Sequence, residues 1–130
     1  MFIDSSIIIE IFKGNEKAVE ISEKLIFDSS ISINEVVYSE VLYQLCFRKN
    51  FSKSEVGELL LKSFNFLEIN KKILNLSLFY IKKYNLKPND SLIFATCKYY
   101  GIKKLISLDN DYKKICEDEN MILINSKDLL

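Results

Sequence analysis

The sequence predicts a three-layer α/β/α fold in which helices cover both faces of a central, mainly parallel sheet of four to five short strands. Short apolar runs alternate with helical patterns along almost the whole chain. Such alternation indicates a parallel sheet, because each crossover must travel back along the sheet. The 130 residues suit one domain that spans residues 1–130. Their composition, 48% hydrophobic and 28% charged, is typical of a soluble globular protein.

The first part of the chain shows this alternation clearly. Gly14 fits the left-handed position that closes a short helix, and Asn34 is a favourable N-cap for a longer helix. The predicted strands cover Phe2–Ile3 and Ser30–Ile33, and the predicted helices cover Ser5–Phe12, Glu16–Phe27 and the segment from Asn34 to about Lys49.

The second part of the chain continues the pattern. Ser52 and Glu55 match a capping box ahead of an apolar run. Asn70 is a favourable N-cap, and Gly101 fits the end of a helix. The predicted helices run from Ser52 through Leu59–Leu61, from Asn70 to about Tyr84, over Asp90–Tyr100 and over Tyr112–Glu117, and the predicted strands cover Phe66–Ile69, Lys104–Ser107 and Met121–Ile124.

The residue types that the chain lacks limit which side chains could take part in catalysis or bind a metal. It has no histidine, which removes the usual acid–base group near neutral pH and the commonest ligand of transition metals. Its three cysteines are far apart and form no CxxC pair, so the spacing of a zinc or redox motif is missing. Any catalysis must therefore use carboxylates, hydroxyls, lysines or cysteines.

Charge and targeting signals favour the cytoplasm without selecting a partner. Lys plus Arg and Asp plus Glu each number 18, so net charge argues neither for nor against nucleic acid. The first residues show no basic segment and no cleavage site, and the apolar runs are far shorter than a membrane span. We expect a cytoplasmic location and no membrane association.

Several acids lie where the predicted fold places functional sites. In a parallel sheet, such sites lie outside the carboxyl ends of the strands, and Asp4 and Asp109 each follow a predicted strand. Asp90 begins a mostly apolar helix, so its carboxylate lies at the positive end of that helix. Glu40 is surrounded in the sequence by apolar helical residues and is expected to point inward.

Each acid also has an ordinary structural explanation. Asp90 could be a plain N-cap, and Asp4 could cap the helix that follows it. Asp109 and Asp111 could be turn residues. Glu40 is harder to explain, because an unpaired buried carboxylate costs several kcal/mol. Carboxylates that converge on one edge repel one another unless a cation lies between them, so together they predict a site for Mg²⁺ or Mn²⁺.

Four motifs occur in a defined order along the chain. The first is a strand that ends in an acid and a hydroxyl pair (Phe2–Ile7), and the second is a glutamate inside an apolar helix (Ser32–Leu45). The third is an acid that opens a helix (Asp90–Thr96), and the fourth is a Ser-x-Asp-x-Asp-aromatic stretch (Ser107–Tyr112). In this order they resemble the motifs of the PIN domain, a small metal-dependent nuclease fold that includes the VapC-type toxins of toxin–antitoxin pairs. The resemblance spans essentially the whole chain.

The resemblance implies a function and a cofactor. The function is hydrolysis of RNA by the toxin component of a toxin–antitoxin pair, with an antitoxin protein as partner. The cofactor is Mg²⁺ or Mn²⁺, as one or two ions held by Asp4, Glu40, Asp90 and Asp109. A non-catalytic PIN-like module that binds RNA or protein is the alternative.

Other residues have roles that depend on the same resemblance. Asp111 is either a further metal ligand or the N-cap of the next helix. Ser5 and Ser107 are candidate hydroxyls that contact the metal ligands or the phosphate. Arg48 and Lys49 are candidate RNA contacts, because they lie on the same predicted helix as the glutamate and phosphate contacts dominate nucleic-acid affinity.

Two helical segments are more apolar than contact with one sheet face requires. They cover Glu35–Phe47 and Leu74–Ile81. A thick core would explain this composition, and so would a surface for a second partner, which is either a homodimer interface or a groove for an amphipathic antitoxin segment. A homodimer is the assembly that we expect.

Overall fold

The computed structural model describes residues 1–26 and 30–125, in which strands and helices alternate as the sequence predicts. The strands are β1 (Phe2–Ile3), β2 (Ser32–Ile33), β3 (Asn65–Phe66), β4 (Lys104–Ile106) and β5 (Ile122–Ile124). The helices are α1 (Ser5–Phe12), α2 (Glu16–Ile26), α3 (Glu35–Leu42), α4 (Lys53–Ser63), α5 (Lys71–Tyr84), α6 (Pro88–Tyr99) and α7 (Lys113–Asp118). A π-helical turn, η1 (Tyr43–Phe47), continues α3, and a 3₁₀ turn, η2 (Asn110–Tyr112), precedes α7. The predicted end of the second helix, at Phe27, lies outside the described residues.

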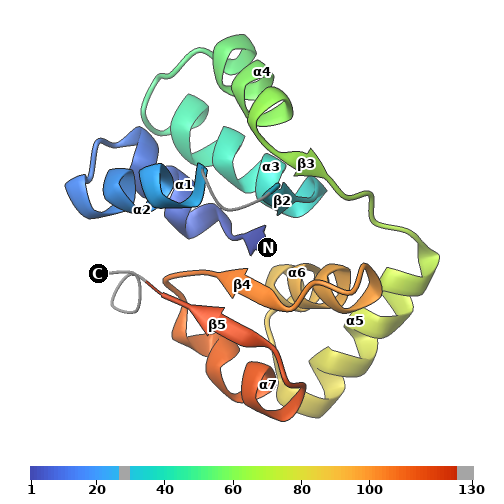
Figure 1. The fold of residues 1–130 in the computed structure, drawn as a ribbon. Coiled ribbons are helices and arrows are strands. Elements are labelled where there is room, and N and C mark those ends of the chain that lie inside the picture. The colour runs from blue at the N-terminus through green and yellow to red at the C-terminus, as the bar shows by residue number, and fades with distance from the viewer. Residues whose placement is uncertain (27–29, 126–130) are drawn as a thin grey trace.

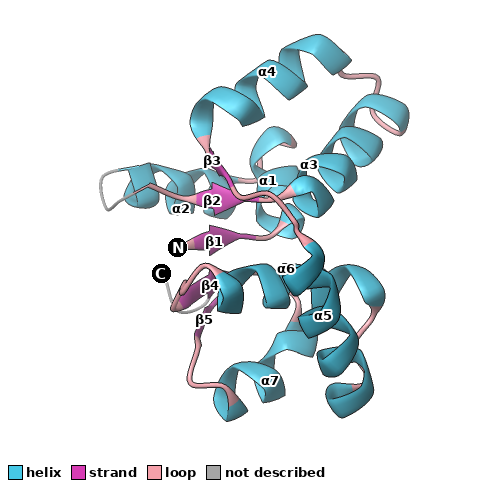
Figure 2. Cartoon of the chain, turned by 90° about the vertical axis from the view of Figure 1, so that its right-hand side faces the viewer, coloured by secondary structure: helices cyan, strands magenta, loops and turns pink. Residues whose placement is uncertain are grey.

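The strands of the described segments form one parallel sheet with the order β3-β2-β1-β4-β5 (Figure 2). Strand β1 is central, with Phe2 paired to Ser32 on one side and to Leu105 on the other. After β3 the chain crosses to the far side of β1, and right-handed crossovers then place the earlier and later helices on opposite faces. In Figure 1, α1 to α4 lie with β2 and β3 in the upper part of the view, and α5 to α7 lie with β4 and β5 in the lower part. The result is the predicted three-layer α/β/α fold, with its switch point at the carboxyl ends of β1 and β4.

The hydrophobic core lies on both sides of the sheet. Phe2 and Ile33 are fully buried, as expected for parallel strands that are covered on both faces. In α3 and η1 the buried residues Val37, Val41 and Leu45 follow one another at helical spacing. The other helices contribute Ile7, Ile8, Val56, Leu60, Ile73, Ile93, Phe94, Cys97, Ile115 and Cys116.

Helix α5 buries one face and exposes the other. Ile73 and Tyr80 are buried, whereas Leu74, Leu78 and Phe79 are 50%, 51% and 51% exposed. A thick core therefore does not explain the apolar composition of residues 74–81, and these side chains remain available to a partner. Within the described ranges, no helix combines the length and the hydrophobicity that a membrane span requires.

The strands are shorter than the sequence predicts, and β3 shows why. It covers Asn65–Phe66 instead of Phe66–Ile69. Leu67 N still donates a ladder hydrogen bond to Ile33 O at 2.8 Å. Ile69 N instead donates to both carboxylate oxygens of Glu35, at 2.9 and 3.1 Å, so a side chain of α3 draws the backbone out of the sheet. Strands β2, β4 and β5 are likewise trimmed by one or two residues, to Ser32–Ile33, Lys104–Ile106 and Ile122–Ile124.

The helix predicted to run to Lys49 is interrupted. It stays α-helical only to Leu42 and then forms the π-helical turn η1. The wider turn keeps Leu45 fully buried, while Tyr43 and Phe47 stack on the exposed side with ring centroids 5.4 Å apart. Apolar periodicity did not indicate this turn, because a single π-turn changes the spacing by only one residue.

Two helix starts also differ from the prediction. Helix α6 begins at Pro88 instead of Asp90, because proline is favourable at the first helical position, where its missing N–H has no partner in any case. Ser52 occupies the N-cap of α4 as predicted, but its side chain makes no capping bond. Its hydroxyl contacts Ser54 Oγ at 3.2 Å instead, so the predicted capping box does not form.

Asn34 connects two helices that carry candidate acids. Its Oδ1 accepts from Val37 N at 3.1 Å and caps α3, while its Nδ2 donates to Thr96 Oγ1 of α6 at 2.9 Å. Asn34 and Thr96 are fully buried, so water does not compete for these hydrogen bonds. Asn70 makes the same capping bond at the start of α5, from Ile73 N at 2.9 Å.

We expect Asn34→Ala to lower the free energy of unfolding by about 2 kcal/mol, because it removes a helix cap worth about 1 kcal/mol and a buried hydrogen bond of similar value. Asn70→Ala, the matched control, removes a cap alone and should cost about 1 kcal/mol. Urea unfolding measures both losses. Equal losses would show that the hydrogen bond to Thr96 does not stabilise the packing of α3 on α6.

Candidate metal centre

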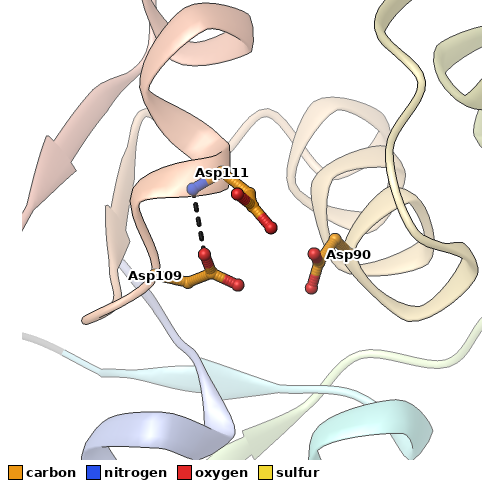
Figure 3. A group of neighbouring side chains, drawn as sticks. All are labelled: Asp90, Asp109 and Asp111. Atoms are coloured by element: carbon orange, nitrogen blue, oxygen red, sulfur yellow. Dashed lines mark hydrogen bonds between the residues drawn. The ribbon is translucent and has the colours of Figure 1, made fainter.

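Three carboxylates meet beyond the carboxyl ends of the central strands. Asp90 of α6 and Asp109 and Asp111 of the segment after β4 each offer an oxygen, and these oxygens lie within 4.8 Å of one another (Figure 3). Asp90 and Asp109 are half-buried, and Asp111 is exposed. This close group contains three of the five predicted metal ligands. Asp4 and Glu40, the other two, are not members of this close group and lie around it.

The turn η2 brings both aspartates of the Asp109-Asn110-Asp111 stretch to the centre. Asp109 keeps an extended backbone and is the N-cap of η2, since its Oδ1 accepts from Asp111 N at 2.9 Å. Asp111 lies within the turn, and both carboxylates face Asp90 (Figure 3). The alternative role of Asp111 as a helix N-cap is wrong, because Asp109 caps η2 and Tyr112 occupies the N-cap of α7.

Asp4 is held at the end of β1. Its backbone N–H donates to Ile106 O at 2.9 Å, and its Oδ2 accepts from Ser107 Oγ at 2.7 Å and from Ser6 Oγ at 3.0 Å. Although Asp4 occupies the N-cap position of α1, its side chain makes no capping bond, so that ordinary explanation is wrong. Burial raises the pKa of Asp4, despite the opposing effect of the two hydroxyls.

Hydroxyl groups connect Asp4 to the loop that carries Asp109. Ser107 Oγ donates to Asp4 and accepts from Asp109 N at 3.0 Å. Ser6 Oγ donates to Asp4 and accepts from Leu108 N at 3.1 Å. The sequence predicts a role for Ser107 but misses Ser6. The hydroxyl pair that follows Asp4 was the signal that could have indicated it.

Glu40 approaches the centre from α3. Ser5 Oγ donates to Glu40 Oε1 at 3.3 Å, so these two predicted residues contact each other. The side chain of Glu40 is half-buried. Burial raises its pKa, and repulsion from Asp4 and then from Asp90 adds to the effect.

Asp90 has one oxygen with a partner and one without. Its Oδ1 accepts from Tyr112 Oη at 3.2 Å. Its Oδ2 is buried and accepts no hydrogen bond from the described residues. The N-cap of α6 is Lys87, so Asp90 is not a plain N-cap. The sequence analysis missed Tyr112, although the aromatic position of the Asp-x-Asp-aromatic stretch marks it.

The two cations predicted to contact RNA lie at the end of η1. Arg48 and Lys49 are both exposed, and the guanidinium carbon of Arg48 lies 5.6 Å from the ring centroid of Tyr43. Within the described part of the chain, neither residue forms an ion pair with an acid. Both side chains are therefore available to a phosphate.

The ligand atoms of the centre fit a hard divalent cation. They are carboxylate oxygens in a chain without histidine, and oxygen ligands with excess negative charge suit Mg²⁺ or Mn²⁺. No ion pair with Lys or Arg neutralises these acids within the described ranges. The buried, unpaired Oδ2 of Asp90 supplies a further lone pair for an ion.

The chain is similar to known proteins over most of its length. Residues 1–118 match the profile of the PIN domain family. "Ribonuclease VapC6" of Methanocaldococcus jannaschii is 37% identical over 140 aligned positions, which cover 88% of this chain and 92% of the relative. "Ribonuclease VapC2" of the same organism is 34% identical over 131 aligned positions, with 88% of each chain covered.

A solved structure shows the same fold. It is a toxin–antitoxin complex from Klebsiella pneumoniae, in which one chain superposes with a TM-score of 0.76 at 24% sequence identity. The superposition covers 88% of this chain and 91% of the other.

The crowded acids predict a pH-dependent stability of the metal-free protein. Burial, followed by repulsion from Asp109, raises the pKa of Asp90 from 3.8 to about 6. Between these values the folded state binds more protons than the unfolded chain, so the contribution of Asp90 to stability falls as pH rises. Replacement by asparagine removes this effect, and the new amide can donate toward Asp109 and Asp111.

We therefore expect Asp90→Asn to raise the Tm of EDTA-treated protein by roughly 4 °C at neutral pH, the shift that about 1 kcal/mol produces in a chain of this size after allowance for solvent screening. The difference from wild type should shrink as pH falls to about 4. Circular dichroism measures both curves, with Asp118→Asn on the exposed end of α7 as control. A lower Tm for Asp90→Asn at neutral pH would contradict the proposed cost of burying the charged carboxylate near other acids.

Proposed function

The chain belongs to the PIN domain family, and from this premise we propose that it is a ribonuclease that hydrolyses RNA phosphodiester bonds with the help of Mg²⁺ or Mn²⁺. The observation that carries the proposal is the meeting of Asp90, Asp109 and Asp111 at the switch point of the sheet, with Asp90 Oδ2 unpaired. Two relatives above 30% identity are both named ribonucleases, which supports RNA as the substrate class.

The five acids divide into a close group and a supporting pair. Asp90, Asp109 and Asp111 would hold the first ion, and Asp4 and Glu40 would complete its coordination or hold a second ion. When bound, such an ion neutralises charge on the phosphodiester and lowers the pKa of a water molecule. The site needs no histidine for this chemistry.

The chain's own groups prepare the site before RNA binds. Hydrogen bonds from Ser6 and Ser107 fix Asp4, and the bond from Ser5 orients Glu40. If Asp4 alone completes the coordination, Glu40 would accept a proton from the attacking water, because a raised pKa makes a carboxylate a better base. The water oxygen then bonds to phosphorus, the ester P–O bond breaks, and the leaving oxygen takes a proton from solvent.

The biological role that we propose is that of a toxin paired with an antitoxin protein. Family membership and the names of the relatives support this role. The exposed apolar side chains of η1 and α5, Tyr43, Phe47, Leu74, Leu78 and Phe79, offer surfaces for a homodimer contact and for the antitoxin. The free state of all three cysteines agrees with a reducing cytoplasm.

We expect the purified chain to cleave single-stranded RNA in the presence of Mg²⁺ or Mn²⁺ and to lose this activity in EDTA. Asp90→Asn should lower the rate by at least about 100-fold, since even outer partners of metal ligands are worth about 10- to 100-fold. Asp118→Asn, an exposed acid outside the centre, should cleave at the wild-type rate. A labelled oligonucleotide resolved by gel electrophoresis measures all three proteins.

Two other outcomes would change the conclusion. Equal cleavage by wild type and folded Asp90→Asn would identify a contaminating nuclease. No cleavage of several different RNAs by a wild type that still binds them would favour the non-catalytic PIN-like module.

A second prediction concerns the RNA contacts. In the inactive Asp90→Asn background, Arg48→Ala/Lys49→Ala should weaken RNA binding and reduce the slope of log Kd against log salt concentration by about 1 for each lost phosphate contact. The matched control is Lys103→Ala/Lys104→Ala, because these exposed lysines lie at the amino end of β4, away from the carboxyl edge. Fluorescence anisotropy measures the slopes. Equal slopes for the two double variants would argue against RNA contacts at Arg48 and Lys49.

A further inference from the structure

A hydrogen bond joins the two segments that supply the close carboxylate group. Asp90 comes from α6, whereas Asp109 and Asp111 come from the segment after β4. Tyr112 immediately follows Asp111, and its hydroxyl donates to Asp90 Oδ1 at 3.2 Å across a sequence separation of 22 residues. The same short turn thus presents two of the carboxylates and holds the third.

The two oxygens of Asp90 are in different situations. Oδ1 is engaged by Tyr112, while Oδ2 is buried without a hydrogen-bond donor among the described residues. We propose that Tyr112 is a positioning residue of the metal centre, whose hydroxyl holds Asp90 Oδ1 and thereby fixes the carboxylate with Oδ2 free to bind a metal ion. This inference rests on the proposed metal-dependent function.

The surroundings of Tyr112 suit this role. The residue is fully buried, so its ring has little freedom to move the hydroxyl. A carboxylate accepts hydrogen bonds and a tyrosine hydroxyl can donate one, so Tyr112 is the donor in this contact with Asp90.

Packing alone does not explain a tyrosine at this position. A phenylalanine ring would fill the same volume in the core, and a buried hydroxyl is costly unless it has a partner. The partner that the structure provides is Asp90. Groups that orient a metal ligand in this way change metal affinity as well as activity, which separates a positioning role from a purely structural one.

The test measures Mn²⁺ binding by the full chain with Tyr112→Phe. Electron paramagnetic resonance quantifies the free Mn²⁺ at each point of the titration. We expect the Kd for Mn²⁺ to rise by about tenfold, while Tm in EDTA confirms that the variant is folded. Tyr80→Phe is the matched control, because Tyr80 is a similarly buried tyrosine of α5, with 2% exposure. Its Kd for Mn²⁺ should equal that of wild type.

The outcomes separate this inference from the proposed function. A folded Tyr112→Phe that binds Mn²⁺ within about twofold of wild type, or a similar loss in Tyr80→Phe, would overturn the positioning role even if RNA cleavage is intact. Wild-type protein that does not bind Mn²⁺ would overturn it as well. Weakened binding in Tyr112→Phe alone, in a protein that cleaves no RNA, would support the positioning role while the ribonuclease proposal fails.

Discussion

The burial of carboxylates close to one another is the constraint on which the rest of this structure depends. The pKa values of Asp4, Glu40 and Asp90 are all raised, first by burial and then by neighbouring acids. Folding alone would favour separation of these groups, because the charged forms lose hydration and no Lys or Arg of residues 1–26 or 30–125 forms an ion pair with them. The fold nevertheless keeps the oxygens of Asp90, Asp109 and Asp111 within 4.8 Å of one another. These close carboxylates therefore lower the stability of the metal-free protein, and a cation bound between them would restore it.

In the part of the chain that the structure describes, the groups that hold Asp4, Glu40 and Asp90 are hydroxyls and not cations. Ser5, Ser6, Ser107 and Tyr112 each donate to one of the carboxylates. A hydroxyl orients a carboxylate without adding a positive charge, so it does not compete with a metal ion as a lysine or arginine would. The parallel sheet and the buried Asn34–Thr96 hydrogen bond supply the rigid support, because they place β1, β4, α3 and α6 against one another.

The sequence by itself determined several helix ends and the edge of the sheet on which the acids lie. Asn34 and Asn70 cap their helices as predicted, and Gly14 and Gly101 adopt the left-handed backbone. These features depend on residues only a few positions apart, so a local pattern is sufficient to indicate them. The strand–helix alternation likewise implied a parallel sheet, and Asp4 therefore had to share an edge with the acids that follow β4.

Only the tertiary structure decided which of these groups touch. The hydrogen bonds from Ser107 to Asp4 and from Tyr112 to Asp90 join residues 103 and 22 positions apart. Asp111 joins the close group because η2 turns it toward α6, and Glu35 shortens β3 by capturing a backbone N–H of the next segment. The physical reason is common to all of these cases. A hydrogen bond forms or fails over a few tenths of an ångström, and such distances are set by the packing of whole layers, about which a local sequence pattern carries no information.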